Sequence, residues 1–182
     1  MMHKALYLDR DGILNKVVMR DGVVGSPRNK KEFEILEDAH YLTEMATDLG
    51  FKSIVISKQP DVDRGLMTLE KLERINDLLR DKLLIEHIEF CTSGDDEHHG
   101  RKPNPGMLLD TAHMYKINLK ESFFVGDGWK DVKAGKRAGV KTILLQTDYN
   151  KEIHGSADYN CNSIKEIVEL IKSLNEKAKN VH

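Results

Sequence analysis

The chain has 182 residues, of which 40% are hydrophobic and 32% are charged, a composition typical of a folded globular protein. Its 28 Lys and Arg residues and 30 Asp and Glu residues give a net charge of −2, which excludes a strongly basic nucleic-acid-binding surface and offers no attraction to an anionic membrane. No apolar run approaches the ~18 residues that a membrane span needs, so we expect a soluble, cytoplasmic protein.

Five short apolar runs predict strands, and an amphipathic stretch follows each of them. The strands are expected at residues 5–8, 51–56, 88–91, 123–125 and 142–145. The helices are expected at residues 42–49, 69–83, 103–115, 129–138 and 163–174. Strand followed by helix, repeated along the chain, predicts an α/β protein with a three-layer, doubly wound parallel sheet.

One segment breaks this alternation. Residues 16–37 fit no strong period and contain Gly22, Gly25 and Pro27 among many charges, so they predict a loop excursion. We expect a single domain over residues 1–182, with the 16–37 excursion near the functional site and a frayed tail at 178–182.

Polar side chains follow the predicted strands where each strand ends. Asp9 and Asp11 follow the first strand, and Ser57 ends the second. Asp127 follows the fourth strand, and Lys102 precedes the third helix. Ligands of open α/β sheets bind beyond the carboxyl ends of the strands, so these side chains are expected to converge.

The converging residue types point to metal-assisted phosphate chemistry. Carboxylates that meet at one point repel each other unless a cation lies between them, and oxygen ligands suit Mg²⁺ with a substrate phosphate. Ser57 and Lys102 would then face that phosphate with a hydroxyl and a positive charge. Asp9 and Asp11 divide into an attacking carboxylate and a proton donor for the leaving alcohol.

Four segments in this order resemble the motifs of the haloacid dehalogenase superfamily of phosphohydrolases. They are LDRDG at 8–12, Ser57 after the second strand, RKP at 101–103 and GDGWKD at 126–131. The resemblance covers residues 4–147, and four motifs in order are a specific signal although each alone is weak. It implies a Rossmann-like fold of that superfamily without a large cap domain.

Within the superfamily, DRDG followed by Asn15, together with RKPNPGML, is similar to the group of D-glycero-D-manno-heptose 1,7-bisphosphate 7-phosphatases and histidinol-phosphate phosphatases. The resemblance implies that Asp9 is the nucleophile and Asp11 the acid–base residue. It implies an Mg²⁺ site formed by Asp9, the Asp11 carbonyl and Asp127.

The same resemblance assigns the phosphoryl group to Ser57 and Lys102, and the rest of the substrate to Arg101. We count Asp131 as a supporting residue of the metal site. Arg28, in the excursion after the nucleophile, is a further candidate for substrate contact.

Two departures from the group's pattern affect these expectations. The usual Thr-Asn-Gln of the second motif is Ser57-Lys58-Gln59 here, so Lys58 adds a positive charge near the substrate. Many relatives carry a zinc loop before RKP, but only Cys91, His98 and His99 remain as ligands, and a structural zinc site takes four. We therefore expect a zinc-free loop; a site completed by an acid from residues 95–97 is the alternative.

The expected activity is hydrolysis of a small phosphorylated metabolite, a sugar bisphosphate first of all, through an aspartyl-phosphate. Histidinol phosphate or another small metabolite is the alternative substrate. A phospho-acceptor signalling module is the alternative from a different class, and Asp11 argues against it because a receiver needs no acid two residues past its phosphorylated aspartate. The sequence does not predict an oligomeric state.

Overall fold

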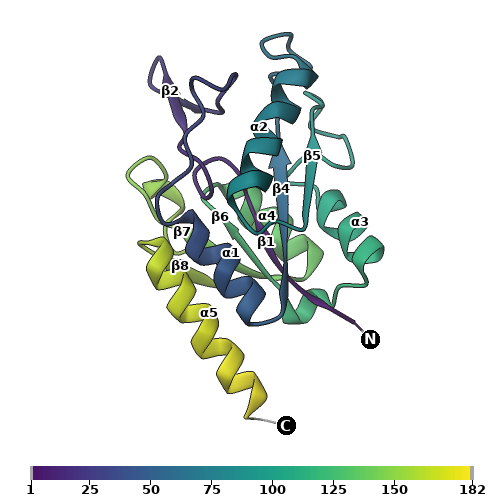
Figure 1. Ribbon diagram of the computed structural model, residues 1–182, viewed down its shortest axis with the longest axis vertical. Coiled ribbons are helices and arrows are strands. Elements are labelled where there is room, and N and C mark those ends of the chain that lie inside the picture. Colours follow the sequence, from purple (N-terminus) through teal and green to yellow (C-terminus); the bar gives the residue numbers. More distant parts are fainter. Residues whose placement is uncertain (1, 181–182) are drawn as a thin grey trace.

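The central sheet consists of strands that are largely buried on both faces, as a parallel sheet covered by helices requires. The computed structural model describes residues 2–180, and in it six parallel strands pair in the order β5-β4-β1-β6-β7-β8 (Figure 1). The strands are β1 Lys4–Leu8, β4 Phe51–Lys58, β5 His87–Cys91, β6 Phe123–Gly126, β7 Lys141–Leu145 and β8 Tyr159–Cys161. The doubly wound parallel sheet predicted from the sequence is confirmed.

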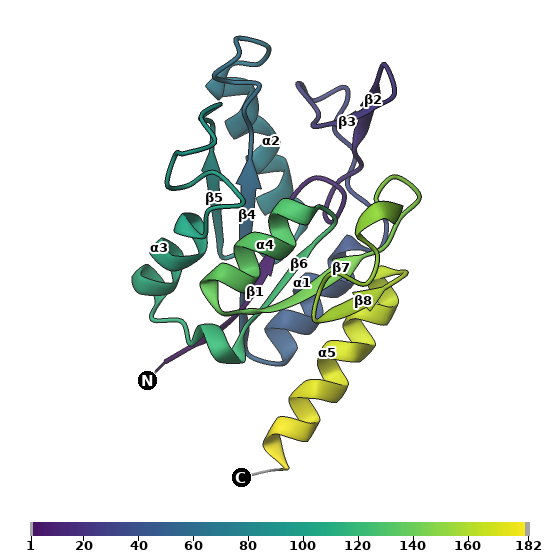
Figure 2. The ribbon, with the colours of Figure 1, turned by 180° about the vertical axis from the view of Figure 1, so that it is seen from behind.

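Helices cover both faces of this sheet and complete three layers, as the two opposite views show (Figures 1 and 2). One face carries α1 Ala39–Asp48, α2 Leu69–Lys82 and α5 Ile164–Lys179. The other carries α3 Gly106–Tyr115 and α4 Trp129–Ala138. Short 3-10 turns occupy Leu119–Glu121 and Lys151–Ile153.

Alternation along β1 divides the core between the two faces. Leu6 and Leu8 belong to the apolar cluster beneath α1, α2 and α5, whereas Ala5 and Tyr7 belong to the cluster beneath α3 and α4. All four are fully buried, because successive side chains of a strand point to opposite faces and both faces are covered here.

Local signals set several helix ends as predicted. The Thr68 side chain accepts a hydrogen bond from the Lys71 amide at 3.2 Å and caps α2. Gly139 ends α4 with φ +84°, a left-handed conformation that glycine adopts without a Cβ penalty.

Two features at the C-terminal side differ from the expectation. Strand β8 was not predicted, because three residues at the edge of the sheet are too few to show a period. Helix α5 continues to Lys179, five residues past the predicted end, so residues 178–179 of the expected frayed tail are helical. Residues 181–182 of that tail lie outside the described residues.

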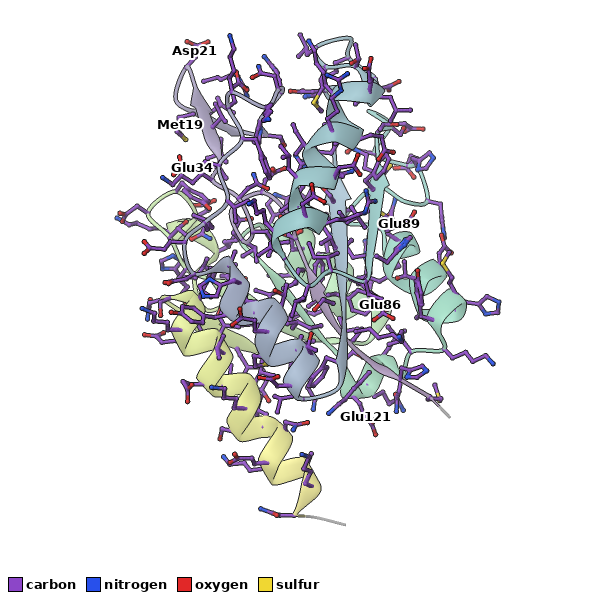
Figure 3. The ribbon with its side chains drawn as sticks, in the orientation of Figure 1. Met19, Asp21, Glu34, Glu86, Glu89 and Glu121 are labelled. Atoms are coloured by element: carbon purple, nitrogen blue, oxygen red, sulfur yellow. The ribbon has the colours of Figure 1, made fainter. Side chains whose placement is uncertain are left out.

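The 16–37 excursion contains a small hairpin separate from the main sheet. Strands β2 Val18–Arg20 and β3 Val23–Gly25 pair antiparallel through Asp21 and Gly22, whose φ angles of +50° and +76° suit a tight hairpin turn. The hairpin projects beyond the carboxyl edge of the sheet (Figure 2), with Asp21 at its tip and Met19 partway along it (Figure 3). The hairpin therefore lies next to the edge at which ligands of open α/β sheets bind.

None of the helices described between residues 2 and 180 is long and apolar enough to cross a membrane.

Candidate active site

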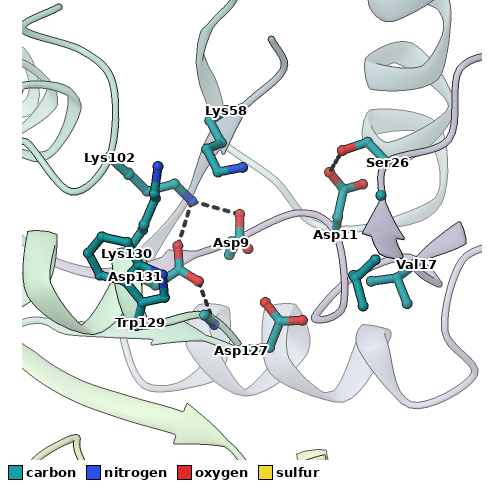
Figure 4. Close-up of a pocket in the computed structure, with 13 residues that line it drawn as sticks. Asp9, Asp11, Val17, Ser26, Lys58, Lys102, Asp127, Trp129, Lys130 and Asp131 are labelled. Atoms are coloured by element: carbon teal, nitrogen blue, oxygen red, sulfur yellow. Dashed lines mark hydrogen bonds and ion pairs between the residues drawn. The ribbon is translucent and has the colours of Figure 1, made fainter. Parts of the chain in front are cut away.

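Loops after three parallel strands bring polar side chains to one edge of the sheet. Asp9 follows β1, Lys58 is the last residue of β4, and Asp127 follows β6. Asp131 comes from the first turn of α4, and Lys102 from the loop before α3. They share a cavity of about 280 Å³ (Figure 4), whose other lining residues include Asp11, Val17, Ser26, Trp129 and Lys130.

Lys102 is a buried cation that joins two of the acids. Its ammonium group donates to Asp9 Oδ1 at 2.8 Å, to Asp131 Oδ1 at 2.7 Å and to the Ile56 carbonyl at 2.9 Å. Burial acts to lower the pKa of Lys102, but the two carboxylates outweigh it and raise that pKa above its ordinary value. The lysine is therefore held charged, in one position, beside Asp9.

Three carboxylates around this lysine form a cluster suited to a divalent cation. Oxygen atoms of Asp9, Asp127 and Asp131 lie within 4.8 Å of one another. Burial and then the Asp131 charge raise the pKa of Asp9 well above its ordinary value, and the same two causes raise the pKa of Asp127 to about 7. A divalent cation would relieve this repulsion, and all-oxygen donors match Mg²⁺.

The hydrogen bonds distinguish the free oxygens of the cluster from the occupied ones. Asp131 uses both, since Oδ1 accepts from Lys102 and Oδ2 accepts from the Gly128 amide at 3.0 Å. Asp127 Oδ2 accepts from the Tyr149 hydroxyl at 2.5 Å. Among the described residues, no hydrogen bond ends on Asp9 Oδ2 or Asp127 Oδ1, so these two atoms are free to meet a ligand.

Asp11 lines the same cavity but has a different environment. Its carboxylate accepts hydrogen bonds from the Arg10 guanidinium at 3.0 Å, Asn15 at 2.9 Å, Ser26 at 2.7 Å and Gln59 at 2.8 Å. Burial acts to raise the pKa of Asp11, but Arg10 and the three neutral donors outweigh it and lower that pKa. The two aspartates of the DRDG segment therefore have pKa shifts of opposite sign.

Lys58 points into the cavity near Asp9 (Figure 4). Among the described residues, its ammonium group has no hydrogen-bond or ion-pair partner. Burial and the charge of Lys102 lower the pKa of Lys58.

Three other sequence candidates lie outside the lining of this cavity. The Ser57 hydroxyl is buried and accepts a hydrogen bond from Gln59 at 2.8 Å. Arg101 donates to Asp96 at 2.7 Å and to a backbone carbonyl of its own loop. Arg28 donates to a carboxylate in an adjoining cavity. Their roles toward a substrate stay predictions.

The loop before RKP brings two of the three zinc candidates together. Cys91 Sγ lies 3.5 Å from His98 Nδ1. The ring of His99 is within 3.0 Å of the Asp110 carboxylate and so engages helix α3 instead.

Sequence reasoning missed the residues that orient the acids. Ser26 comes from the excursion, and Tyr149 and Asn150 follow β7, where no motif was evident. The Asn150 side chain donates to the Asp127 carbonyl at 2.8 Å. The position of this loop after a parallel strand was the signal that could have directed attention to it.

Comparison with known proteins relates this geometry to a named chemistry. The model of the HAD-hydrolase-like family matches residues 99–167. The chain is 34% identical over 178 residues to D-glycero-beta-D-manno-heptose-1,7-bisphosphate 7-phosphatase of Helicobacter pylori, covering 93% of this chain and 98% of that protein. It is 32% identical to D-glycero-D-manno-heptose-1,7-bisphosphate 7-phosphatase of Chlorobaculum tepidum, covering 82% of this chain and 81% of that protein.

A solved structure is similar to this chain over the same share of its length as the Helicobacter pylori relative. The D,D-heptose 1,7-bisphosphate phosphatase of B. bronchiseptica, complexed with magnesium and phosphate, superposes with a TM-score of 0.80 at 26% identity. The match covers 93% of this chain and 98% of that one.

Proposed function

The chain belongs to the haloacid dehalogenase superfamily of hydrolases and is a phosphatase, and on this premise we propose that it removes the 7-phosphate from a D-glycero-D-manno-heptose 1,7-bisphosphate. Near full-length similarity to relatives of that name supports the substrate. The observation that carries the chemistry is the free Oδ2 of Asp9 beside Lys102 and Asp127, in a cavity at the carboxyl edge of the sheet.

In this proposal Asp9 attacks the phosphorus atom and forms an aspartyl-phosphate, which water then hydrolyses. Lys102 holds Asp9 through Oδ1, so that the other oxygen is the one presented to the substrate. The fixed ammonium group also balances negative charge that develops on the transferred phosphoryl group.

Asp11 moves the proton in both half-reactions. In the second half-reaction its carboxylate, which the lowered pKa keeps ionised, takes a proton from the attacking water. In the first half-reaction the bond between phosphorus and the sugar oxygen breaks, and a protonated Asp11 donates its proton to that oxygen, which leaves as the sugar hydroxyl. A substrate phosphate bound nearby raises the pKa of a carboxyl group by like-charge repulsion.

The residues present fit an Mg²⁺ ion. The Asp9 and Asp127 carboxylates and the Asp11 carbonyl would hold it, while Asp131, already bonded through both oxygens, positions Lys102. When bound, the ion neutralises charge on the phosphoryl oxygens.

We expect phosphate release to stop after exhaustive chelation and to return when Mg²⁺ is added. Oxygen donors favour a hard cation, and the clustered carboxylates repel one another unless a cation lies between them. Phosphate release measured against metal added back checks this, and full activity in the chelated protein would contradict it. Stoichiometric zinc by metal analysis would instead point to the loop with Cys91 and His98.

Gly12 approaches Asp127 so closely that a side chain does not fit. It has φ +87°, and an added Cβ would lie 1.9 Å from Asp127 Oδ2. We expect Gly12→Ala to displace this carboxylate and to lower kcat/KM about a hundredfold, because a shift of about 1 Å in a site can have that effect.

Gly139→Ala is the matched control for this variant. Gly139 has a similar φ of +84° but open space around its Cβ position, so the control carries the backbone strain without the clash. Both variants are expected to lose thermal stability, and only Gly12→Ala is expected to lose activity. Equal kcat/KM in the two would show that Asp127 tolerates displacement.

A phosphate-release assay tests the substrate. Heptose 1,7-bisphosphate, heptose 7-phosphate, histidinol phosphate and simple sugar phosphates are compared at equal concentration, and we expect kcat/KM to be highest for the bisphosphate. A preference for histidinol phosphate would replace the proposed substrate. A phosphoprotein that forms and persists without turnover would indicate the signalling alternative.

A further inference from the structure

A further cavity, which we call the α4 cavity, lies between helix α4 and the segment that precedes β8. Its volume is about 420 Å³, within the size range of small-molecule sites. Trp129, Val132 and Ile153 supply its apolar lining. Among the described residues, Trp129 is the one that lines both this cavity and the catalytic one. The two cavities are therefore neighbours with different walls.

The rim of the α4 cavity is positively charged. Lys133, Lys136 and Arg137 line it, and its described lining residues include no acid. Spacings of three and four residues place these three cations and Trp129 on one face of α4. Asp131 is the only acid in the sequence of α4, and both of its oxygens accept hydrogen bonds inside the catalytic site. This face of the helix is therefore basic, although the whole chain has a net charge of −2.

The three cations have no acidic partner within residues 2–180. Lys136 donates to the Ser156 carbonyl at 2.6 Å, and Arg137 donates to a backbone carbonyl at 3.2 Å. Lys133 forms neither a hydrogen bond nor an ion pair in the same part of the chain, and its ammonium group lies 5.9 Å from the centre of the Trp129 ring. Because the partners are neutral, all three positive charges can attract an anion.

Trp129 gives the α4 cavity an aromatic surface. It is the single tryptophan of the chain and is 49% exposed. The ammonium groups of Lys130 and Lys133 lie 5.4 and 5.9 Å from the centre of its ring. An exposed indole stacks with planar rings, and the neighbouring lysines favour a ring that carries negative charge.

We propose that the α4 cavity binds a nucleoside diphosphate or triphosphate, with its base stacked on Trp129 and its phosphates at Lys133, Lys136 and Arg137. A nucleotide combines a planar aromatic group with several negative charges, which are the two features that this cavity matches. An anion without a ring leaves the indole unused, and an uncharged ring leaves the cations unused. The site does not depend on which sugar the catalytic cavity accepts.

Fluorescence of the wild-type protein tests the site directly, because Trp129 is its single tryptophan. The probe is α,β-methylene-ADP, whose terminal phosphorus is bonded to carbon and is not released as phosphate. Titrations without Mg²⁺ are expected to show saturable quenching. Adenosine and methylenediphosphonate should each bind at least about tenfold more weakly, because each makes only the stacking or only the charged contacts.

Substitutions at the two cavities show where the probe binds. The double variant Lys133→Ala/Lys136→Ala should weaken binding at least about tenfold, because two exposed charge contacts are lost. Calorimetry of Trp129→Ala should show a loss of similar size, since stacking of the base is lost. Lys58→Ala, which changes only the catalytic cavity, should bind the probe as the wild-type protein does.

Lys141→Ala is the matched control. Lys141 also lies over an aromatic ring, with its ammonium group 5.4 Å from the centre of the Phe123 ring, but it lines a cavity beside α5 instead. It should leave the affinity for the probe unchanged.

Four results would overturn the nucleotide site. They are an absence of saturable quenching, an affinity unchanged in both the double variant and Trp129→Ala, and an equal or larger loss of affinity in Lys58→Ala, which would place the probe in the catalytic cavity. The fourth is binding of methylenediphosphonate or a hexaglutamate peptide as tight as that of the probe. This last result would identify the face of α4 as a surface for anions in general or for an acidic protein segment.

Discussion

Asp9→Asn is expected to abolish phosphate release while the protein stays folded. An amide oxygen cannot become an aspartyl-phosphate, and loss of a covalent nucleophile commonly lowers turnover by several orders of magnitude. The substitution keeps the shape of the side chain and removes one of the clustered negative charges, so the fold is expected to tolerate it.

Phosphate release under saturating Mg²⁺, together with thermal unfolding, provides the measurement. Asp77→Asn is the matched control, because Asp77 is an exposed acid on α2 whose one ion-pair partner among residues 2–180 is Arg80 on the same helix. It should retain full activity. Near-normal turnover by a folded Asp9→Asn protein would reject the covalent mechanism, and the cavity would then need a different nucleophile.

Among the substitutions proposed for this protein, Lys102→Met is expected to lower the free energy of unfolding most. It is also expected to lose most of the phosphatase activity. Lys102 is 2% exposed and contacts Asp9 and Asp131, so its removal leaves buried carboxylates without their cation. Breaking a buried ion pair by deleting one partner typically costs about 3–5 kcal/mol of unfolding free energy. Turnover falls as well, because Lys102 is the one positive charge that the described part of the chain places against Asp9 Oδ1.

The sign of the pH dependence follows from Asp9. Burial and neighbouring acids already raise the pKa of Asp9, and removal of the Lys102 charge raises it further. A carboxyl group whose pKa is higher in the folded than in the unfolded state destabilises the fold when it ionises, and this penalty shrinks as the pH falls through the folded-state pKa. The loss of unfolding free energy in Lys102→Met, relative to wild type, is therefore expected to be smaller at about pH 5 than at about pH 8.

Denaturant unfolding of the wild-type protein and of Lys102→Met at both pH values tests the predicted pH dependence of the stability loss. Lys172→Met, an exposed lysine on α5 that pairs with Glu169, is the control and should change stability by less than about 1 kcal/mol. A pH-independent deficit would show that Lys102 stabilises the fold by packing alone. The Mg²⁺ concentration must be held constant, because a bound cation also stabilises the folded state.

The sequence alone was sufficient to predict the sheet and the acids that converge on it. Parallel strands all present their carboxyl ends at one edge, so the residue after each apolar run is placed by the backbone direction of its own strand. Asp9 and Asp127 were identified in this way, and Lys102 from its place before the third helix. The structure brings all three into one cavity. The edge strand β8 was not predicted, because three residues are too few to show a hydrophobic period.

The tertiary structure decided which polar groups meet, because those contacts depend on the paths of loops that are distant in sequence. Asp11 meets Ser26 from the excursion and Gln59 directly after β4, and these donors, added to Arg10 and Asn15, outweigh burial and lower its pKa. Arg101 belongs to the same RKP motif as Lys102 and directly precedes it. Its guanidinium group nevertheless contacts Asp96, outside the cavity. A strand direction can be deduced from local apolar pattern, whereas the orientation of a loop side chain depends on partners tens of residues away, which only the folded chain brings within hydrogen-bond distance.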